Sequence, residues 1–167
     1  ASPRPLGGLG PIGPLAFGAN GVLFAADPKA ATVFALTLKA DATAAPGAVS
    51  VDKIDQRIAA ALGTDASQIA ITDLAVHPTT HNAFVAVMRG QGAEARPALF
   101  RVDGAGKVDL VAFDTVTFTS VALPNPADVS PNGRGGRTQS VTDMALVDGR
   151  LVVAGLSNEE FASKLWS

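Results

Sequence analysis

Thr72-Asp73-Leu74-Ala75-Val76 is one of three stretches that share a pattern; the others are Gly13-Pro14-Leu15-Ala16-Phe17 and Thr142-Asp143-Met144-Ala145-Leu146. Each stretch consists of a small or polar pair, a large apolar residue, an alanine and a second large apolar residue. A turn follows each stretch, and an apolar run of strand length follows each turn. This internal repeat predicts the same strand–turn–strand unit three times along the chain.

The turns between these strands contain residues suited to tight hairpins. Asn20-Gly21 and Asp148-Gly149 supply the positive φ angles that such turns need, and residues 77–82 include a proline. Glycine and proline also interrupt the rest of the chain at short intervals, so long helices are not expected. The strands that we expect after the turns and further along the chain are residues 21–26, 32–38, 83–88, 98–102, 108–113, 116–118 and 150–155. The sequence therefore predicts a mostly β fold.

Length and composition exclude several classes of protein. The chain has 167 residues, of which 47% are hydrophobic and 17% charged, so it can bury a core. The chain has 13 Lys and Arg and 15 Asp and Glu, so it lacks the excess of positive charge that is typical of nucleic-acid-binding proteins. It has no cysteine, which excludes disulfides, thiol nucleophiles and Cys-ligated metal. No apolar run is long enough to predict a membrane-spanning helix.

Two insertions lengthen the repeats. Residues 50–63 have apolar residues at helical spacing, with Ser50 as the expected N-cap and Gly63 as the expected end. Residues 123–140 are rich in Pro, Asn, Gly and Arg and predict a long exposed loop. The resulting division of the chain is a Gly/Pro-rich lead-in (1–14), a first repeat (15–71), a second repeat (72–140) and the start of a third (141–167).

The repeat resembles that of bacterial β-propellers, in the superfamily of NHL, YncE-like and quinoprotein-like repeats. The resemblance is carried by residues 13–17 with 21–27, by residues 72–78 and by residues 141–145. It implies antiparallel blades, with two blades and the start of a third in this chain. Propellers close with roughly 4–8 blades. The expected fold is therefore an incomplete ring, completed by further blades or by other chains, and a β-sandwich of the same strands is the alternative.

The chain begins with Ala1-Ser2 and shows no charged segment followed by an apolar one, so no signal peptide is recognised. Such a beginning fits a processed end after export and equally fits proteolysis. Together with the resemblance, it leads us to expect a periplasmic or secreted protein.

Asp73 and Asp143 hold equivalent positions in the repeat. The resemblance places this position near the mouth of a propeller's central channel, where the two carboxylates would bind a ligand or a cation such as Ca²⁺. The alternative is that each aspartate accepts hydrogen bonds from backbone N–H groups in a turn. The first repeat has Pro14 at this position, which favours the alternative.

Asp27 and Arg89 follow the second strand of their repeats, where propeller loops form one face, and both are candidate ligand-binding residues. His77 and His81 are four residues apart, but Pro78 lies between them in a predicted turn, which favours turn residues over a metal site. No Gly-x-Ser-x-Gly motif predicts a nucleophilic serine, and no catalytic residue can be named.

Two functional hypotheses remain at this stage. The first is a binding or scaffolding module without chemistry of its own. The second is part of a propeller enzyme, a metal-dependent hydrolase or a quinoprotein-like oxidoreductase, with a site at the channel mouth. The sequence favours the first, because only Asp73 and Asp143 recur at equivalent positions. The expected partners are further blades or other chains, and Trp166 is expected to pack against residues outside this chain.

Overall fold

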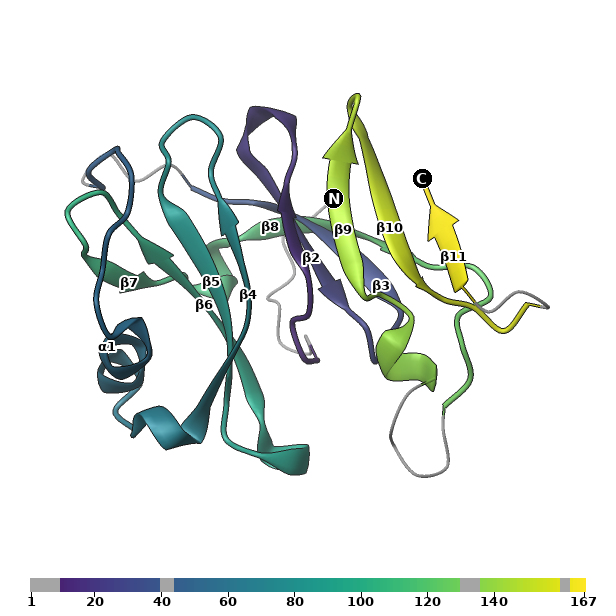
Figure 1. The fold of residues 1–167 in the computed structure, drawn as a ribbon, viewed down its shortest axis with the longest axis horizontal. Coiled ribbons are helices and arrows are strands. Elements are labelled where there is room, and N and C mark those ends of the chain that lie inside the picture. The colour runs from purple at the N-terminus through teal and green to yellow at the C-terminus, as the bar shows by residue number, and fades with distance from the viewer. Residues whose placement is uncertain (1–9, 40–43, 130–135, 160–162) are drawn as a thin grey trace.

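The computed structural model describes residues 10–39, 44–129, 136–159 and 163–167 (Figure 1). These residues form three antiparallel sheets and one short α-helix, so the prediction of a mostly β fold is confirmed. The first sheet has four strands in the order β1-β2-β3-β8. Their bounds are Leu15–Phe17 (β1), Val22–Asp27 (β2), Thr32–Thr37 (β3) and Thr117–Ala122 (β8).

The second sheet has the order β4-β5-β6-β7, and the third has the order β9-β10-β11. The strands of the second sheet are Ile69–Val76 (β4), Ala83–Arg89 (β5), Arg96–Val102 (β6) and Val108–Leu110 (β7). Those of the third sheet are Asp143–Val147 (β9), Arg150–Leu156 (β10) and Ser163–Trp166 (β11). The three repeated stretches of the sequence thus lie in or begin β1, β4 and β9, each the first strand of its sheet.

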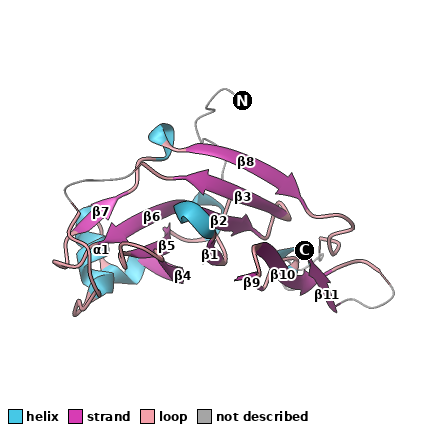
Figure 2. Cartoon of the chain, turned by 90° about the horizontal axis from the view of Figure 1, so that it is seen from above, coloured by secondary structure: helices cyan, strands magenta, loops and turns pink. Residues whose placement is uncertain are grey.

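The three sheets are joined through these first strands. β1 lies between β4 and β9 and contacts both of them. From this line of first strands the sheets extend outward in a fan, with the first sheet in the middle (Figure 2). Within the described residues the sheets do not close into a ring.

The hairpin turns have the backbone angles that the sequence predicts. Asn20 and Gly21 have φ angles of 61° and 73°, and Asp148 and Gly149 have φ angles of 48° and 77°. Asn, Asp and Gly tolerate this left-handed region, which other residues avoid. The turns therefore place β2 and β10 antiparallel to the strands before them.

The helix predicted within residues 50–63 is present, but it starts later than expected. It spans Ile54–Ala61 (α1), and Lys53 occupies the N-cap position with a left-handed φ of 54°. The prediction of Ser50 as the N-cap is therefore wrong, because the chain turns into the helix only at Lys53. At the other end Gly63 has a φ of 65°, as expected of the residue that ends a helix.

β8 does not belong with the strands that precede it in the sequence. The expected second repeat, residues 72–140, contains this segment, yet β8 pairs with β3 of the first sheet from Thr37↔Thr117 to Thr32↔Ala122. The edge of β3 would otherwise lack a partner, and the rings of Phe34 and Phe118 pack across the pair with centroids 5.8 Å apart. The second sheet takes β7 as its fourth strand instead.

Two further expectations about the chain's later half need correction. The segment 123–140 is not an exposed loop throughout, because Leu123 and Ala127 are buried; residues 130–135 lie outside the described part. The third repeat contains a third strand that the sequence did not predict, since β11 pairs with β10. Trp166 lies in β11 opposite Val153 and packs within this chain. Of the lead-in, residues 1–9 are outside the description, and Ile12 is buried.

The core consists of apolar faces packed between adjacent sheets, because alternate residues of a strand point to opposite faces. The second sheet packs on the first through Ala75, Phe84, Ala86 and Leu99, which meet Leu15, Leu23 and Leu36. The first sheet packs on the third through Ala16, Phe24, Ala26 and Val33, which meet Met144, Leu151, Val153 and Trp166. The far face of the second sheet is covered by α1, whose Ile58 packs against Val85, Val87 and Phe100.

Candidate functional site

Asp73 links two sheets through its carboxylate. It lies in β4 just after an irregularity in the pairing with β5. Its Oδ2 accepts a hydrogen bond from the backbone N–H of Leu15 in β1 at 2.7 Å, and its Oδ1 accepts one from the N–H of Leu74 at 2.8 Å. Both oxygens therefore accept backbone hydrogen bonds, which is the alternative that the sequence left open.

Asp143 has the same local geometry without the second link. Its Oδ1 accepts the N–H of Met144 at 2.8 Å, and no residue of the described part bonds its Oδ2. The side chain is exposed, and β1 lies between its strand and the strand of Asp73. The described residues contain no cluster of three or more His, Asp or Glu that could hold a metal ion. A Ca²⁺ site at Asp73 and Asp143 thus stays a prediction.

The other two predicted ligand-binding residues lie in different sheets. Asp27 is buried at the end of β2, where its Oδ1 accepts the N–H of Ala30 at 2.9 Å and its Oδ2 that of Gly10 at 3.0 Å. These bonds hold the turn after β2 and the lead-in. Arg89 is exposed at the end of β5, opposite Arg96 of β6. The structure therefore does not bring Asp27 and Arg89 together in one site.

His77 serves as a turn residue, as its neighbours in the sequence suggest. Its Nδ1 accepts hydrogen bonds from the backbone N–H groups of Thr79 and Thr80, both at 3.2 Å. Its ring also packs edge-on against Phe17, with centroids 5.0 Å apart. His77 therefore stabilises the β4–β5 turn and packs it against the first sheet.

Asp103, which the sequence analysis did not single out, organises the β6–β7 hairpin. Its Oδ1 accepts the N–H groups of Lys107 at 2.9 Å and Ala105 at 3.0 Å, and its Oδ2 accepts that of Ala45 at 3.1 Å. These bonds, that from Lys107 foremost, lower the pKa of the Asp103 carboxyl below its ordinary value of 3.8. The Asp-Gly-x-Gly sequence at residues 103–106 was the available signal.

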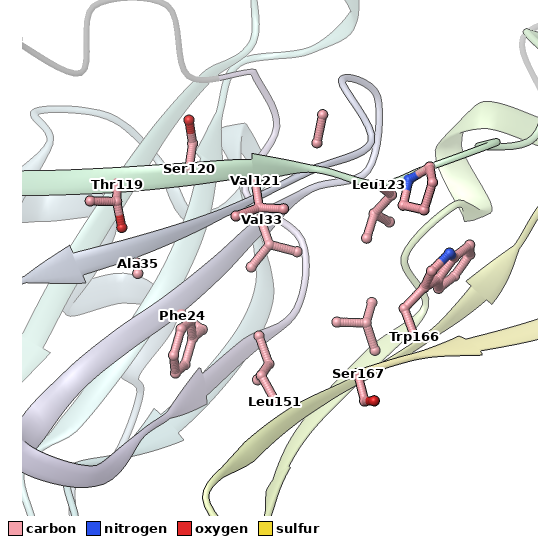
Figure 3. Close-up of a pocket in the computed structure, with 13 residues that line it drawn as sticks. Phe24, Val33, Ala35, Thr119, Ser120, Val121, Leu123, Leu151, Trp166 and Ser167 are labelled. Atoms are coloured by element: carbon pink, nitrogen blue, oxygen red, sulfur yellow. The ribbon is translucent and has the colours of Figure 1, made fainter.

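The site with the shape of a binding surface is an apolar cleft between the first and third sheets. It has a volume of about 410 Å³ and opens between the outer strands β3 and β8 on one side and β10 and β11 on the other (Figure 3). Its walls are mainly apolar side chains, chiefly Phe24, Val33, Val121, Leu123, Leu151 and Trp166. We call it the Trp166 cleft.

The Trp166 cleft arises because the two sheets differ in width. β8 extends the first sheet to four strands, whereas the third sheet has three in the described part of the chain. The outer part of the first sheet therefore has no strand opposite it, and Val121 of β8 is 69% exposed. No local pattern in the sequence indicates this cleft, because the pairing of β8 with β3 joins segments about 85 residues apart.

One polar group without a partner belongs to a residue of the cleft wall. The indole Nε1 of Trp166 is buried, and no described residue accepts its hydrogen bond. A buried N–H without an acceptor is unfavourable, and Trp usually bonds a partner when buried. The hydroxyl of Thr119 points to the same side of β8 as Val121 and lines the cleft, whereas that of Ser120 points to the other side (Figure 3). The arrangement suits a ligand with an apolar body and one hydrogen-bond acceptor.

Comparisons with family models, with curated proteins and with solved structures found no match. Among the described helices, none combines the length and the hydropathy needed to span a bilayer.

Proposed function

We propose that this chain is a section of a β-propeller that acts as a binding module. The observation that carries the proposal is the arrangement of the three sheets, in which equivalent first strands lie side by side and the sheets extend outward from them. In a β-sandwich two sheets cover each other as layers, whereas blades of a propeller follow one another around an axis. Three sheets in a row favour blades over the sandwich.

The Trp166 cleft is the binding surface of this module. Ligand sites are concave, mostly apolar and supplied with a few polar groups that orient the ligand. Phe24, Leu151 and Val121 supply the apolar walls, and the hydroxyl of Thr119 supplies a donor. The ligand class is an apolar group that carries a hydrogen-bond acceptor, such as an apolar side chain next to a peptide carbonyl.

The alternative of a propeller enzyme with a site at the first strands has less support. Its two candidate carboxylates are Asp73 and Asp143, and both oxygens of Asp73 already accept backbone N–H groups. A carboxylate that joins two strands in this way is held by the fold and has little capacity left for a substrate or a cation.

Fluorescence provides the test, because Trp166 is the one tryptophan of the chain. The probe is 1-anilinonaphthalene-8-sulfonate, which has apolar rings and a sulfonate acceptor. We expect saturable energy transfer from Trp166 to the bound probe. Val121→Asp should weaken probe binding by about tenfold, which corresponds to about 1.4 kcal/mol.

Leu165→Asp is the matched control, because Leu165 is 68% exposed, as much as Val121, but lies on the opposite face of β11 from Trp166. Probe affinity should change little in this variant. An affinity that Val121→Asp leaves unchanged would contradict the proposal, and so would an equal loss in both variants.

A further inference from the structure

The outer face of the third sheet has apolar residues at four positions. In the other two sheets, the residues at the same four positions pack against a neighbouring sheet. In each sheet, the alanine of the repeated stretch lies opposite a residue of the second strand. Two residues after this partner, the second strand has another alanine, which lies opposite a residue of the third strand. The four positions of the third sheet are Ala145, Val152, Ala154 and Leu165.

The same four positions are covered in the other two sheets. In the second sheet they are Ala75, Phe84, Ala86 and Leu99, all buried against the first sheet. In the first sheet they are Ala16, Phe24, Ala26 and Val33, which pack against the third sheet. In the third sheet none of the four is buried, and Leu165 is 68% exposed. A hollow of about 310 Å³ lies on this face beside Ala154 and Leu165.

A carboxylate accompanies this set on the same face. Asp73 lies opposite Ala86, and its Oδ2 bonds the N–H of Leu15 in the neighbouring sheet. Asp143 lies opposite Ala154 in the same way, and its Oδ1 makes the same bond to the next residue. Its Oδ2 is the atom that corresponds to the intersheet bond of Asp73, and it bonds nothing in the described part of the chain.

The two ends of the row of sheets therefore differ. At the second sheet α1 packs on the outward face, where its Ile58 is fully buried, and it leaves Leu74 and Val76 of β4 exposed. At the third sheet the outward face has the residues of an intersheet contact and no cover from the described residues. The faces that carry the complementary large residues Leu15 and Met144 are already in contact with a neighbouring sheet of this chain.

We propose that the outer face of the third sheet is the docking site of a fourth antiparallel sheet, and that Asp143 binds the leading N–H of that sheet's first strand. This inference rests on the proposed propeller section and names its next neighbour. The docking surface continues an interface that the molecule already builds twice, with the same residue types at the same positions. The partner sheet presents large apolar residues to Ala145, Val152 and Leu165, as the third sheet presents Met144, Leu151 and Trp166 to the first.

The test adds a fourth sheet that has the sequence of the third sheet of this chain. The full chain is extended after Ser167 by a Gly/Ser linker of about 10 residues and a second copy of residues 141–167. Hydrogen exchange then compares the extended and the original chain. We expect the appended strands, and the Ala145 to Leu165 face, to exchange at least about tenfold more slowly than an unstructured segment and the uncovered face.

Two pairs of substitutions in the original part of the extended chain test whether the protection of the appended strands depends on this face. Asp143→Asn should reduce the protection of the appended strands, whereas Asp148→Asn, in the β9–β10 turn, should leave it unchanged. Leu165→Asp should abolish the protection, whereas Val121→Asp should not, although the two residues are equally exposed. Retained protection of the original three sheets shows that each variant is folded.

Three results would overturn the inference. The appended strands could exchange as an unfolded segment, or their protection could be insensitive to Leu165→Asp. The extended chain could also form a closed dimer with the appended strands unprotected, which would make a second copy the occupant of the face. The dye titration reports on the Trp166 cleft, on the other side of the third sheet, so a failure there is distinguishable from a failure here.

Discussion

Asp73 and Asp143 show how one residue type has different consequences at equivalent positions. The sequence places them at equivalent positions of the repeat, and in the structure both lie in the first strand of a sheet, where Oδ1 accepts the N–H of the next residue. Only Asp73 reaches a neighbouring sheet, through the N–H of Leu15. The sequence could not predict this partner, because Leu15 lies 58 residues away and becomes a neighbour only when the sheets pack.

The difference between the two aspartates is measurable as stability. Asp73→Ala removes a charged acceptor from the N–H of Leu15, and we expect the free energy of unfolding to fall by about 1.5–3 kcal/mol. Asp143→Ala removes only a bond to its own neighbour and should cost clearly less. Urea unfolding of both variants gives the comparison, and equal losses would show that the intersheet bond contributes nothing.

Asp103 predicts how stability depends on pH. Its pKa is lowered in the folded state, chiefly by the Lys107 N–H, so the unfolded chain binds the proton first on acidification. The carboxyl's stabilising effect is complete well above pH 3.8 and is lost as the pH falls through 3.8 towards the lower folded value. Urea unfolding over a pH series should show a smaller decline in the Asp103→Asn variant. An identical decline in both proteins would contradict this assignment.

At the scale of elements, the local signals of the sequence were sufficient where structure depends on neighbours in the chain. Asn20-Gly21 and Asp148-Gly149 form the expected turns, and Gly63 follows the helix at its end. Apart from Ser50, which is not the N-cap because the chain turns into the helix only at Lys53, the errors concern distant partners. β8 pairs with β3 rather than with the strands before it, and the short β11 is recognisable only beside β10. Strand pairing across long separations has no local pattern to reveal it.

The helix α1 contributes through one buried residue. Ile58 is fully buried between α1 and the second sheet, so Ile58→Ala leaves a cavity there. We expect it to lower the free energy of unfolding by about 2–4 kcal/mol. Gln56→Ala on the exposed side of the same helix is the control and should have little effect. Thermal unfolding followed by circular dichroism measures both, and a small loss for Ile58→Ala would mean that α1 does not close this face.

At the scale of the whole molecule, the three sheets form an open row whose two ends are unlike. α1 covers the second sheet, whereas the third sheet exposes Val147 and Leu165. The three repeated stretches predicted three sheets, but the order of the sheets in space depends on how they pack on one another. That order is second, first, third, since β1 contacts both β4 and β9. Open apolar faces and free strand edges promote association.

Sedimentation equilibrium of the purified chain tests the central claim, that this is an open section of a propeller, most directly. We predict that the weight-average mass rises above 16.8 kDa with concentration, and that Leu165→Asp reduces the rise. A constant mass of 16.8 kDa at all concentrations, together with one sharp unfolding transition, would contradict the account.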